Sequence, residues 1–136
     1  LRMERLSHNA FRLAQALEKL EGVSVNYPLL ESSPYHELAE KQLSGKGGAI
    51  LTIRTGSKER AYKLINHLKY VKIATNIGDV RTLVIHPAST IYIHSTPEAM
   101  EEAGVYDDTI RISVGIEDIK DLIQDFTEAV ESLGEE

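Results

Sequence analysis

The stretch that decides the fold is TIRISVGIED, residues 109–118 of the 136-residue chain. Over its first half β-branched residues alternate with polar ones, which is typical of a strand with one buried face. The alternation sends Ile110, Ile112 and Val114 to one face and places Arg111 and Ser113 on the other. The acidic pair at its end marks the start of a helix. The stretch therefore predicts a strand that runs directly into a helix and holds a cation away from the core.

Amphipathic helices are predicted at both ends of the chain. Residues 1–21 carry apolar side chains at steps of three and four, and Gly22 ends this helix. Residues 117–133 form the second helix, whose apolar stripe comprises Ile119, Leu122, Ile123, Phe126, Ala129, Val130 and Leu133. Stripes of this width pack on a sheet or on another helix.

Shorter elements fill the middle of the chain. Strands are predicted at 23–27, 49–54, 70–74 and 82–86, and helices at 57–68 and 96–104. Ser33-Pro34 predicts one more short helix, with serine as the cap and proline at the first helical position. Strands interleaved with helices predict an α/β fold, an α+β two-layer sandwich in which helices cover one side of a sheet. Without a linker or repeat, residues 1–136 form a single domain.

Composition excludes several classes of function. The net charge of −6, with lysines and arginines dispersed, disfavours nucleic acid as a partner. The absence of cysteine excludes disulfides and thiolate sites and fits a cytoplasmic protein. No apolar run approaches the roughly 18 residues that span a bilayer, so we expect no membrane partner.

Three motifs suggest chemistry but favour structural roles. The turn at Ser44–Gly48 precedes a strand rather than a helix, so it is not a phosphate loop, and its glycines allow tight geometry or close approach to another backbone segment. The five histidines form no i, i+4 pair, so no metal site is predicted. Glu117 and Asp118 fit the positive end of a helix dipole.

Arg111 and two polar loops are the candidate binding residues. A strand arginine can hold a carboxylate with two parallel hydrogen bonds, or it can pair with a local acid. Asn76, in a turn before Gly78, can bind an anion or merely stabilise the turn. Ser89 and Thr90 place hydroxyls on the next loop. Together they predict half of a carboxylate site without a catalytic base or nucleophile.

A series of motifs then occurs in order along the chain: Tyr27-Pro28, Ser33-Pro34, His36, Gly45-x-Gly47-Gly48, Asn76-Ile77-Gly78-Asp79, Thr82-Leu83-Val84-Ile85-His86-Pro87-Ala88-Ser89-Thr90 and Arg111-Ile112-Ser113-Val114-Gly115-Ile116-Glu117-Asp118. Over essentially the whole chain the series resembles the C-terminal domain of the Cys/Met-metabolism pyridoxal-phosphate (PLP) enzymes. That family includes O-acetylhomoserine sulfhydrylase, cystathionine γ-synthase, cystathionine lyases and methionine γ-lyase.

The resemblance implies a fold and a set of site residues. The chain would be the small C-terminal domain of a fold-type I enzyme, which closes the substrate site, and residues 1–21 would be the end of the inter-domain helix. Arg111 matches the arginine that binds the substrate α-carboxylate, and Asn76 matches a contact to the same group. Ser89 and Thr90 match hydroxyls at the site entrance. The family often continues with Thr-His, whereas this chain has Ile91-Tyr92.

The resemblance also implies where the chemistry lies. None of the eight lysines has the family's Schiff-base context, so we expect PLP to be bound by a domain absent from this chain, no cofactor on this chain alone, and no catalytic residue in it. The expected function of the complete enzyme is γ-replacement on O-acylated homoserine, as in O-acetylhomoserine sulfhydrylase, for homocysteine and methionine biosynthesis.

Several alternatives stay open at this point. The resemblance also allows cystathionine γ-synthase or methionine γ-lyase. A stand-alone carboxylate-binding module and an oligomerisation module are alternatives of another class. The expected partners are the PLP-binding domain, further copies in the family's tetramer and a small amino-acid substrate.

Overall fold

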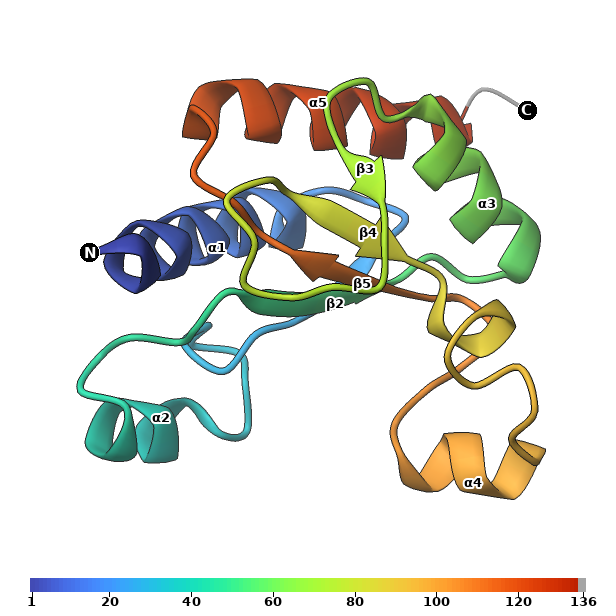
Figure 1. Ribbon diagram of the computed structural model, residues 1–136, viewed down its shortest axis with the longest axis horizontal. Coiled ribbons are helices and arrows are strands. Elements are labelled where there is room, and N and C mark those ends of the chain that lie inside the picture. Colours follow the sequence, from blue (N-terminus) through green and yellow to red (C-terminus); the bar gives the residue numbers. More distant parts are fainter. Residues whose placement is uncertain (135–136) are drawn as a thin grey trace.

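The computed structural model, which describes residues 1–134, is built around a mixed five-stranded sheet in the order β1-β2-β5-β4-β3 (Figure 1). All neighbouring strands pair antiparallel except β3 and β4, which are parallel. The strands are β1 (Ser24–Asn26), β2 (Ile50–Arg54), β3 (Lys72–Ile73), β4 (Leu83–Ile85) and β5 (Thr109–Ser113). Strand β5, which contains Arg111, is therefore the central strand of the sheet.

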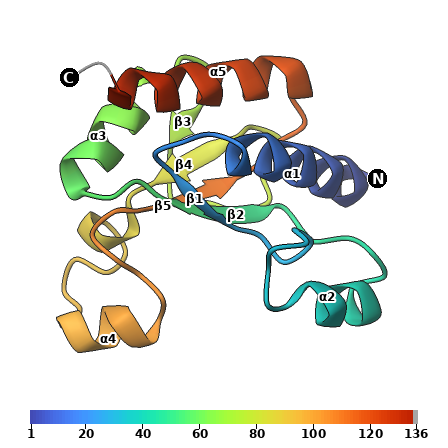
Figure 2. The same ribbon diagram turned by 180° about the vertical axis from the view of Figure 1, so that it is seen from behind.

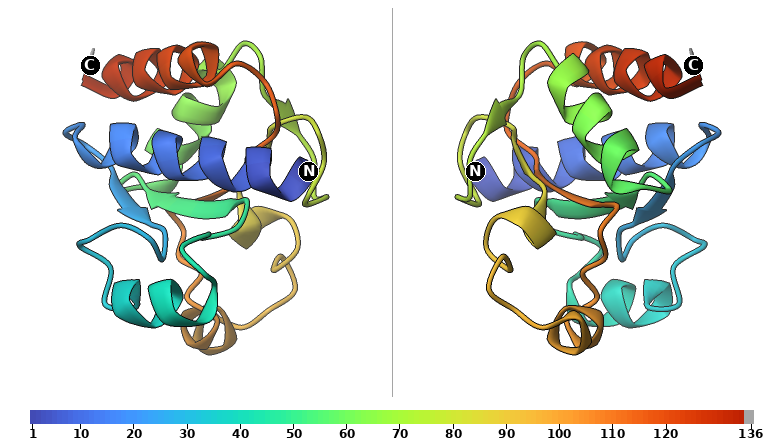
Figure 3. Two further views of the ribbon diagram at one scale, coloured as in Figure 1. Left: turned by 90° about the vertical axis from the view of Figure 1, so that its left-hand side faces the viewer. Right: turned by 90° about the vertical axis from the view of Figure 1, so that its right-hand side faces the viewer.

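Helices lie on both sides of this sheet, but only one side is closely packed. The covering helices are α1 (Arg2–Glu18), α3 (Lys58–His67) and α5 (Ile119–Glu131). Two short helices, α2 (His36–Gln42) and α4 (Pro97–Glu102), stand off the opposite side at its two ends (Figures 1 and 2). Helix α2 buries only Ala39, and α4 buries no residue. The views along the other axis show the same two layers with α2 and α4 beneath them (Figure 3).

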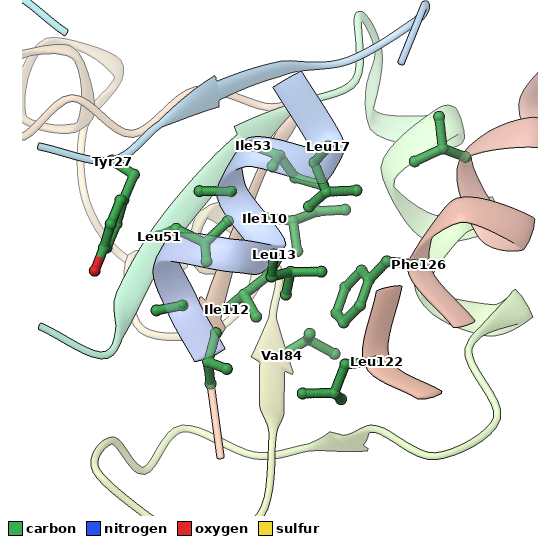
Figure 4. Packing of buried hydrophobic residues seen from close by; sticks show 14 of the residues in the cluster. Leu13, Leu17, Tyr27, Leu51, Ile53, Val84, Ile110, Ile112, Leu122 and Phe126 are labelled. Atoms are coloured by element: carbon green, nitrogen blue, oxygen red, sulfur yellow. The ribbon is translucent and has the colours of Figure 1, made fainter. Parts of the chain in front are cut away.

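The core lies between the sheet and the three covering helices. Ile110 and Ile112 of β5 are 0% exposed, as is Phe126 of α5. Figure 4 shows their side chains together with the others that fill this layer, among them Leu13, Leu17, Leu51, Ile53, Val84 and Leu122. Burial of this apolar surface is the main force that holds α5 on the sheet, at about 25 cal/mol per Å². The predicted fold, a sheet with a layer of helices packed on one side, is confirmed, and only the short helices α2 and α4 stand off the other side.

The register of β5 fixes what lies on the opposite face. Arg111 pairs with Thr52 of β2 and with Ile85 of β4, while Ser113 pairs with Ile50 and Leu83. Directly paired residues point to the same side of a sheet. The alternation predicted for residues 109–114 is therefore confirmed, and Arg111 faces the side that the covering helices leave open.

The glycine turn after α2 has a specific neighbour. A Cβ on Gly47 would lie 2.6 Å from the ring of Tyr27. The Tyr27 hydroxyl donates to the Gly48 carbonyl at 2.8 Å, and burial raises the pKa of Tyr27 to about 12. The close approach expected here is thus to an aromatic ring and not to another backbone segment.

Two predicted helix starts are wrong in detail. The Ser33 hydroxyl accepts from the Tyr35 amide, two residues on, so Ser33 stabilises a turn and α2 begins only at His36. Helix α5 begins at Ile119 because Asp118 is its N-cap and accepts from the Lys120 amide at 2.8 Å.

Two segments expected to be irregular or fully helical are 3₁₀ turns instead: η1 (Pro87–Ser89) and η2 (Ser132–Gly134). None of the helices formed by residues 1–134 combines the length and apolar character that crossing a membrane requires.

Candidate functional site

Arg111 is a partly exposed cation on the open face of the sheet, and no acid among residues 1–134 forms an ion pair with it. Its Nη2 donates to the Thr75 carbonyl at 2.7 Å. Among residues 1–134, none of the ion pairs includes Arg111. The nearby loop acid Asp79 accepts from the Arg81 amide at 2.9 Å instead. The alternative of a sheet arginine paired with a local acid is therefore wrong for this residue.

A neighbouring arginine shows what that alternative looks like. Arg54 lies on the same face of β2, donates to Asp108 at 2.9 Å and stacks 4.0 Å above the ring of Tyr106. Burial alone would raise the pKa of Asp108, but the Gly56 amide and the Arg54 guanidinium outweigh it and hold that pKa below its ordinary value. Arg54 is thus committed to a structural pair, while Arg111 is not.

The turn that contains Asn76 lies over β5. Arg111 binds the carbonyl of Thr75, which forms a peptide bond with Asn76, and the Gly78 amide donates to the Ser113 hydroxyl at 3.1 Å. Asn76 itself is exposed, and its side chain has no hydrogen-bond partner among residues 1–134. The structure therefore brings Asn76 next to the segment that Arg111 holds, with its amide open to a ligand.

Ser89 and Thr90 use their hydroxyls within the chain. Both follow β4 and bond to His86: the Ser89 hydroxyl to Nδ1 at 2.7 Å and the Thr90 hydroxyl to the backbone carbonyl at 2.8 Å. They line a small pocket of about 160 Å³ against α3, and neither Arg111 nor Asn76 borders it. Within this chain the two hydroxyls are used locally, and their contact with a substrate remains a prediction.

A polar network behind the loop was not foreseen from the sequence. Both carboxylate oxygens of Glu117 accept from Thr82, one from its amide and one from its hydroxyl, each at 2.8 Å. The amide of the Asn9 side chain donates to the carbonyls of Gly115 and Glu117 at 2.9 Å. Glu117 therefore holds the start of β4 instead of acting only at a helix dipole.

One sequence signal could have revealed this network. Asn9 is 0% exposed and lies within the apolar stripe of α1, between Leu6 and Ala10. A buried polar residue in such a stripe requires partners, and here they come from the turn between β5 and α5. The network ties α1 to the strand that carries Arg111.

The lysines of the chain do not lie in an enclosed site. All eight lysines are exposed, so none is enclosed where a cofactor could be held against it. Among residues 1–134, no group of three His, Asp or Glu side chains is placed to hold a metal ion. What the chain offers is an unpaired guanidinium and an amide on one open face.

The sequence of this chain is similar to those of known enzymes. A sequence profile described as Cys/Met metabolism PLP-dependent enzyme matches residues 1–131. The chain is 47% identical to homocysteine synthase of Schizosaccharomyces pombe, over 96% of its own length and 31% of the relative's. It is 42% identical to O-acetyl-L-homoserine sulfhydrylase 1 of Thermus thermophilus, again over 96% of this chain and 31% of that one.

The fold of this chain is also similar to that of a solved structure. It is described as a putative O-acetylhomoserine (thiol)-lyase of Campylobacter jejuni with a pyridoxyl-lysine phosphate, and it matches with a TM-score of 0.91 and 35% identity, over 96% of this chain and 31% of that chain. The chain thus spans about a third of the length of the relatives it matches. It belongs to the family of Cys/Met-metabolism PLP-dependent enzymes.

Proposed function

We propose that the chain is the C-terminal domain of a PLP-dependent sulfhydrylase that acts on O-acetylhomoserine and replaces its acyloxy group at the γ-carbon with sulfur. The observation that carries the proposal is the unpaired guanidinium of Arg111 on the open face of the sheet. The names of the relatives support the reaction type, since two of them are a homocysteine synthase and an O-acetyl-L-homoserine sulfhydrylase.

In this proposal Arg111 and Asn76 bind and orient the substrate. The Thr75 carbonyl occupies one N–H of the guanidinium and orients the group. Among residues 1–134 the remaining N–H groups have no partner, so they can bind the α-carboxylate. The Asn76 amide adds a neutral donor to the same group. Holding the carboxylate fixes the position of the γ-carbon relative to the reacting partners, an effect that lowers the barrier through orientation.

We further propose that PLP is held by a second, larger domain of the same enzyme, and that residues 1–21 end the helix that joins the two domains. Large exposed apolar side chains in α2 and in the loops after β3 and β4 support such a partner surface, since they include Leu38, Ile77, Val80, Ile91 and Ile93. Assembly of the enzyme as a tetramer and a cytoplasmic location belong to the same proposal.

Two arginines of the same sheet face provide the test. In the full-length enzyme Arg111→Lys is compared with Arg54→Lys, in steady-state kinetics with O-acetylhomoserine and sulfide. Arg111→Lys is expected to lower kcat/KM by a factor that corresponds to roughly 2–3 kcal/mol of transition-state stabilisation. The reason is that the point charge of lysine cannot reproduce the planar, two-pronged guanidinium. Arg54→Lys can keep its ion pair with Asp108 and should change kcat/KM less than about threefold. Equal effects of the two variants would remove Arg111 from the substrate site.

A stand-alone carboxylate-binding module is the alternative that the open guanidinium also fits. Calorimetry of residues 1–136 with O-acetylhomoserine distinguishes the two. Half of a site should bind only in the millimolar range or more weakly, whereas micromolar binding would favour the module. For the full-length enzyme, turnover with sulfide but not with cysteine would separate the sulfhydrylase from cystathionine γ-synthase, and elimination from methionine would indicate methionine γ-lyase.

A further inference from the structure

The segment Thr75–Gly78 is held on the sheet at its two ends by neighbouring side chains of β5. Arg111 binds the Thr75 carbonyl at 2.7 Å, and the Ser113 hydroxyl accepts from the Gly78 amide at 3.1 Å. The two side chains are two positions apart on one strand and therefore point to the same face. Asn76 lies between the two points of attachment.

The rest of this loop is anchored farther along. The Ile116 amide donates to the Val80 carbonyl at 2.9 Å, and Thr82 bonds to Glu117. The bond from Arg81 to Asp79 is internal to the loop. Within the part of the chain that the structure describes, the Ser113–Gly78 bond is thus the one hydrogen bond that ties the stretch Asn76–Asp79 to the sheet.

We propose that Ser113 is a positioning residue of the carboxylate site, an inference that rests on the proposed function. Ser113 is 1% exposed and cannot itself meet a substrate. It acts through Gly78, which has a positive φ of 71° and whose amide donates to the Ser113 hydroxyl. Without the hydroxyl the segment loosens, and both Asn76 and the carbonyl that orients Arg111 lose their fixed position.

The same strand provides a matched control. Thr109 lies two positions before Arg111, on the same face, and is 3% exposed. Its hydroxyl accepts from the Tyr106 amide at 3.1 Å, the same length as the Ser113–Gly78 bond. That bond closes a local turn and does not involve residues 75–78. Loss of either hydroxyl removes an equivalent hydrogen bond, but only one of the two reaches the Asn76 segment.

The experiment compares variants of the full-length enzyme. Ser113→Val and Ser113→Thr have the same shape and differ by the hydroxyl, and Thr109→Val removes the control hydroxyl. We expect KM for O-acetylhomoserine to be roughly tenfold higher in Ser113→Val than in Ser113→Thr, with kcat changed less than about threefold. KM for sulfide should be unchanged. Thr109→Val should lower the melting temperature without raising KM for either substrate.

The opposite pattern overturns the inference. Equal KM values in Ser113→Val and Ser113→Thr, with only the melting temperature lowered, would give Ser113 a purely structural role. Arg111→Lys, assayed in parallel, separates this outcome from failure of the proposed function. If Arg111→Lys is impaired and the Ser113 pair is not, only the positioning role is lost, whereas unchanged kinetics in Arg111→Lys would remove the proposed function as well.

Discussion

The two faces of β5 differ in what they touch. Ile110 and Ile112 are fully buried against the covering helices, whereas Arg111 and Ser113, on the other face, bind the backbone of a loop. One face is thus fixed by apolar burial, which has no directional demand, and the other by hydrogen bonds whose geometry is specific. If the proposed function holds, substitutions on the two faces of this five-residue strand should affect stability and binding separately.

The largest expected effect lies on the helix face. Phe126→Ala should lower the free energy of unfolding by about 3–5 kcal/mol, because the ring is fully buried between α5 and the sheet and leaves a cavity. Urea unfolding of residues 1–136 measures it. In the full-length enzyme, KM of the molecules that remain folded should be close to wild type. A large rise in KM would show that the two faces are coupled.

Loss of a polar contact on the helix side of the sheet should lower the free energy of unfolding by a smaller amount. The Asp125 carboxylate is buried and accepts from the amides of Lys69 and Tyr70 at 3.0–3.1 Å, which ends the α3 segment. Asp125→Asn replaces one of the two accepting oxygens with an NH₂ group, which cannot accept from these amides. The free energy of unfolding should therefore fall by about 1–3 kcal/mol. Asp121→Asn, on the exposed side of the same helix, is the control and should cost less than about 0.5 kcal/mol. Equal thermal shifts in the two variants would contradict the role of Asp125.

Acid should affect the open face through Asp108. Its pKa is held below the ordinary value in the folded chain, so its contribution to stability is present above the unfolded pKa and is lost as pH falls through the folded pKa. Because the Arg54 side chain is 49% exposed, this contribution should be about 1 kcal/mol or less. Asp108→Asn should therefore flatten the fall in stability as the pH drops below the ordinary pKa of an aspartate, measured by urea unfolding. A slope identical to wild type would show that the pair contributes nothing.

The alternation of residue types along the sequence predicted which side chains lie on each face of the sheet. It could not predict the hydrogen-bond partners, which lie far apart in the sequence. The alternation at 109–114 was sufficient to place Arg111 and Ser113 together, because side-chain direction in a strand follows from position alone. The partner of Ser113 lies 35 residues earlier, and Asn9 meets Gly115 across 106 residues. No spacing rule reaches such pairs. Ser33 shows the converse, since its hydroxyl accepts from the Tyr35 amide in a local turn and the helix begins only at His36.

The site residues divide in the same way. Arg111 binds the carbonyl of the residue next to Asn76, so these two residues lie close together. The hydroxyls of Ser89 and Thr90 form hydrogen bonds with His86 at the end of β4. A serine or threonine on a loop gives no sign in the sequence of whether its hydroxyl bonds locally or remains free. The partly buried pair of Glu117 and Thr82 was missed because an acid beside a helix start already has a sufficient local reason to be there.

We propose that the open face binds a carboxylate through Arg111. The most direct test measures kcat/KM of the full-length enzyme for O-acetylhomoserine and for its carboxamide, in wild type and in Arg111→Lys. We predict that kcat/KM of the wild type is roughly 100-fold higher for the carboxylate than for the carboxamide, and that Arg111→Lys loses most of this preference. The reason is that a neutral carboxamide cannot form the charge-assisted pair of hydrogen bonds with the guanidinium. The same preference in both enzymes would show that another group binds the carboxylate and would contradict the claim.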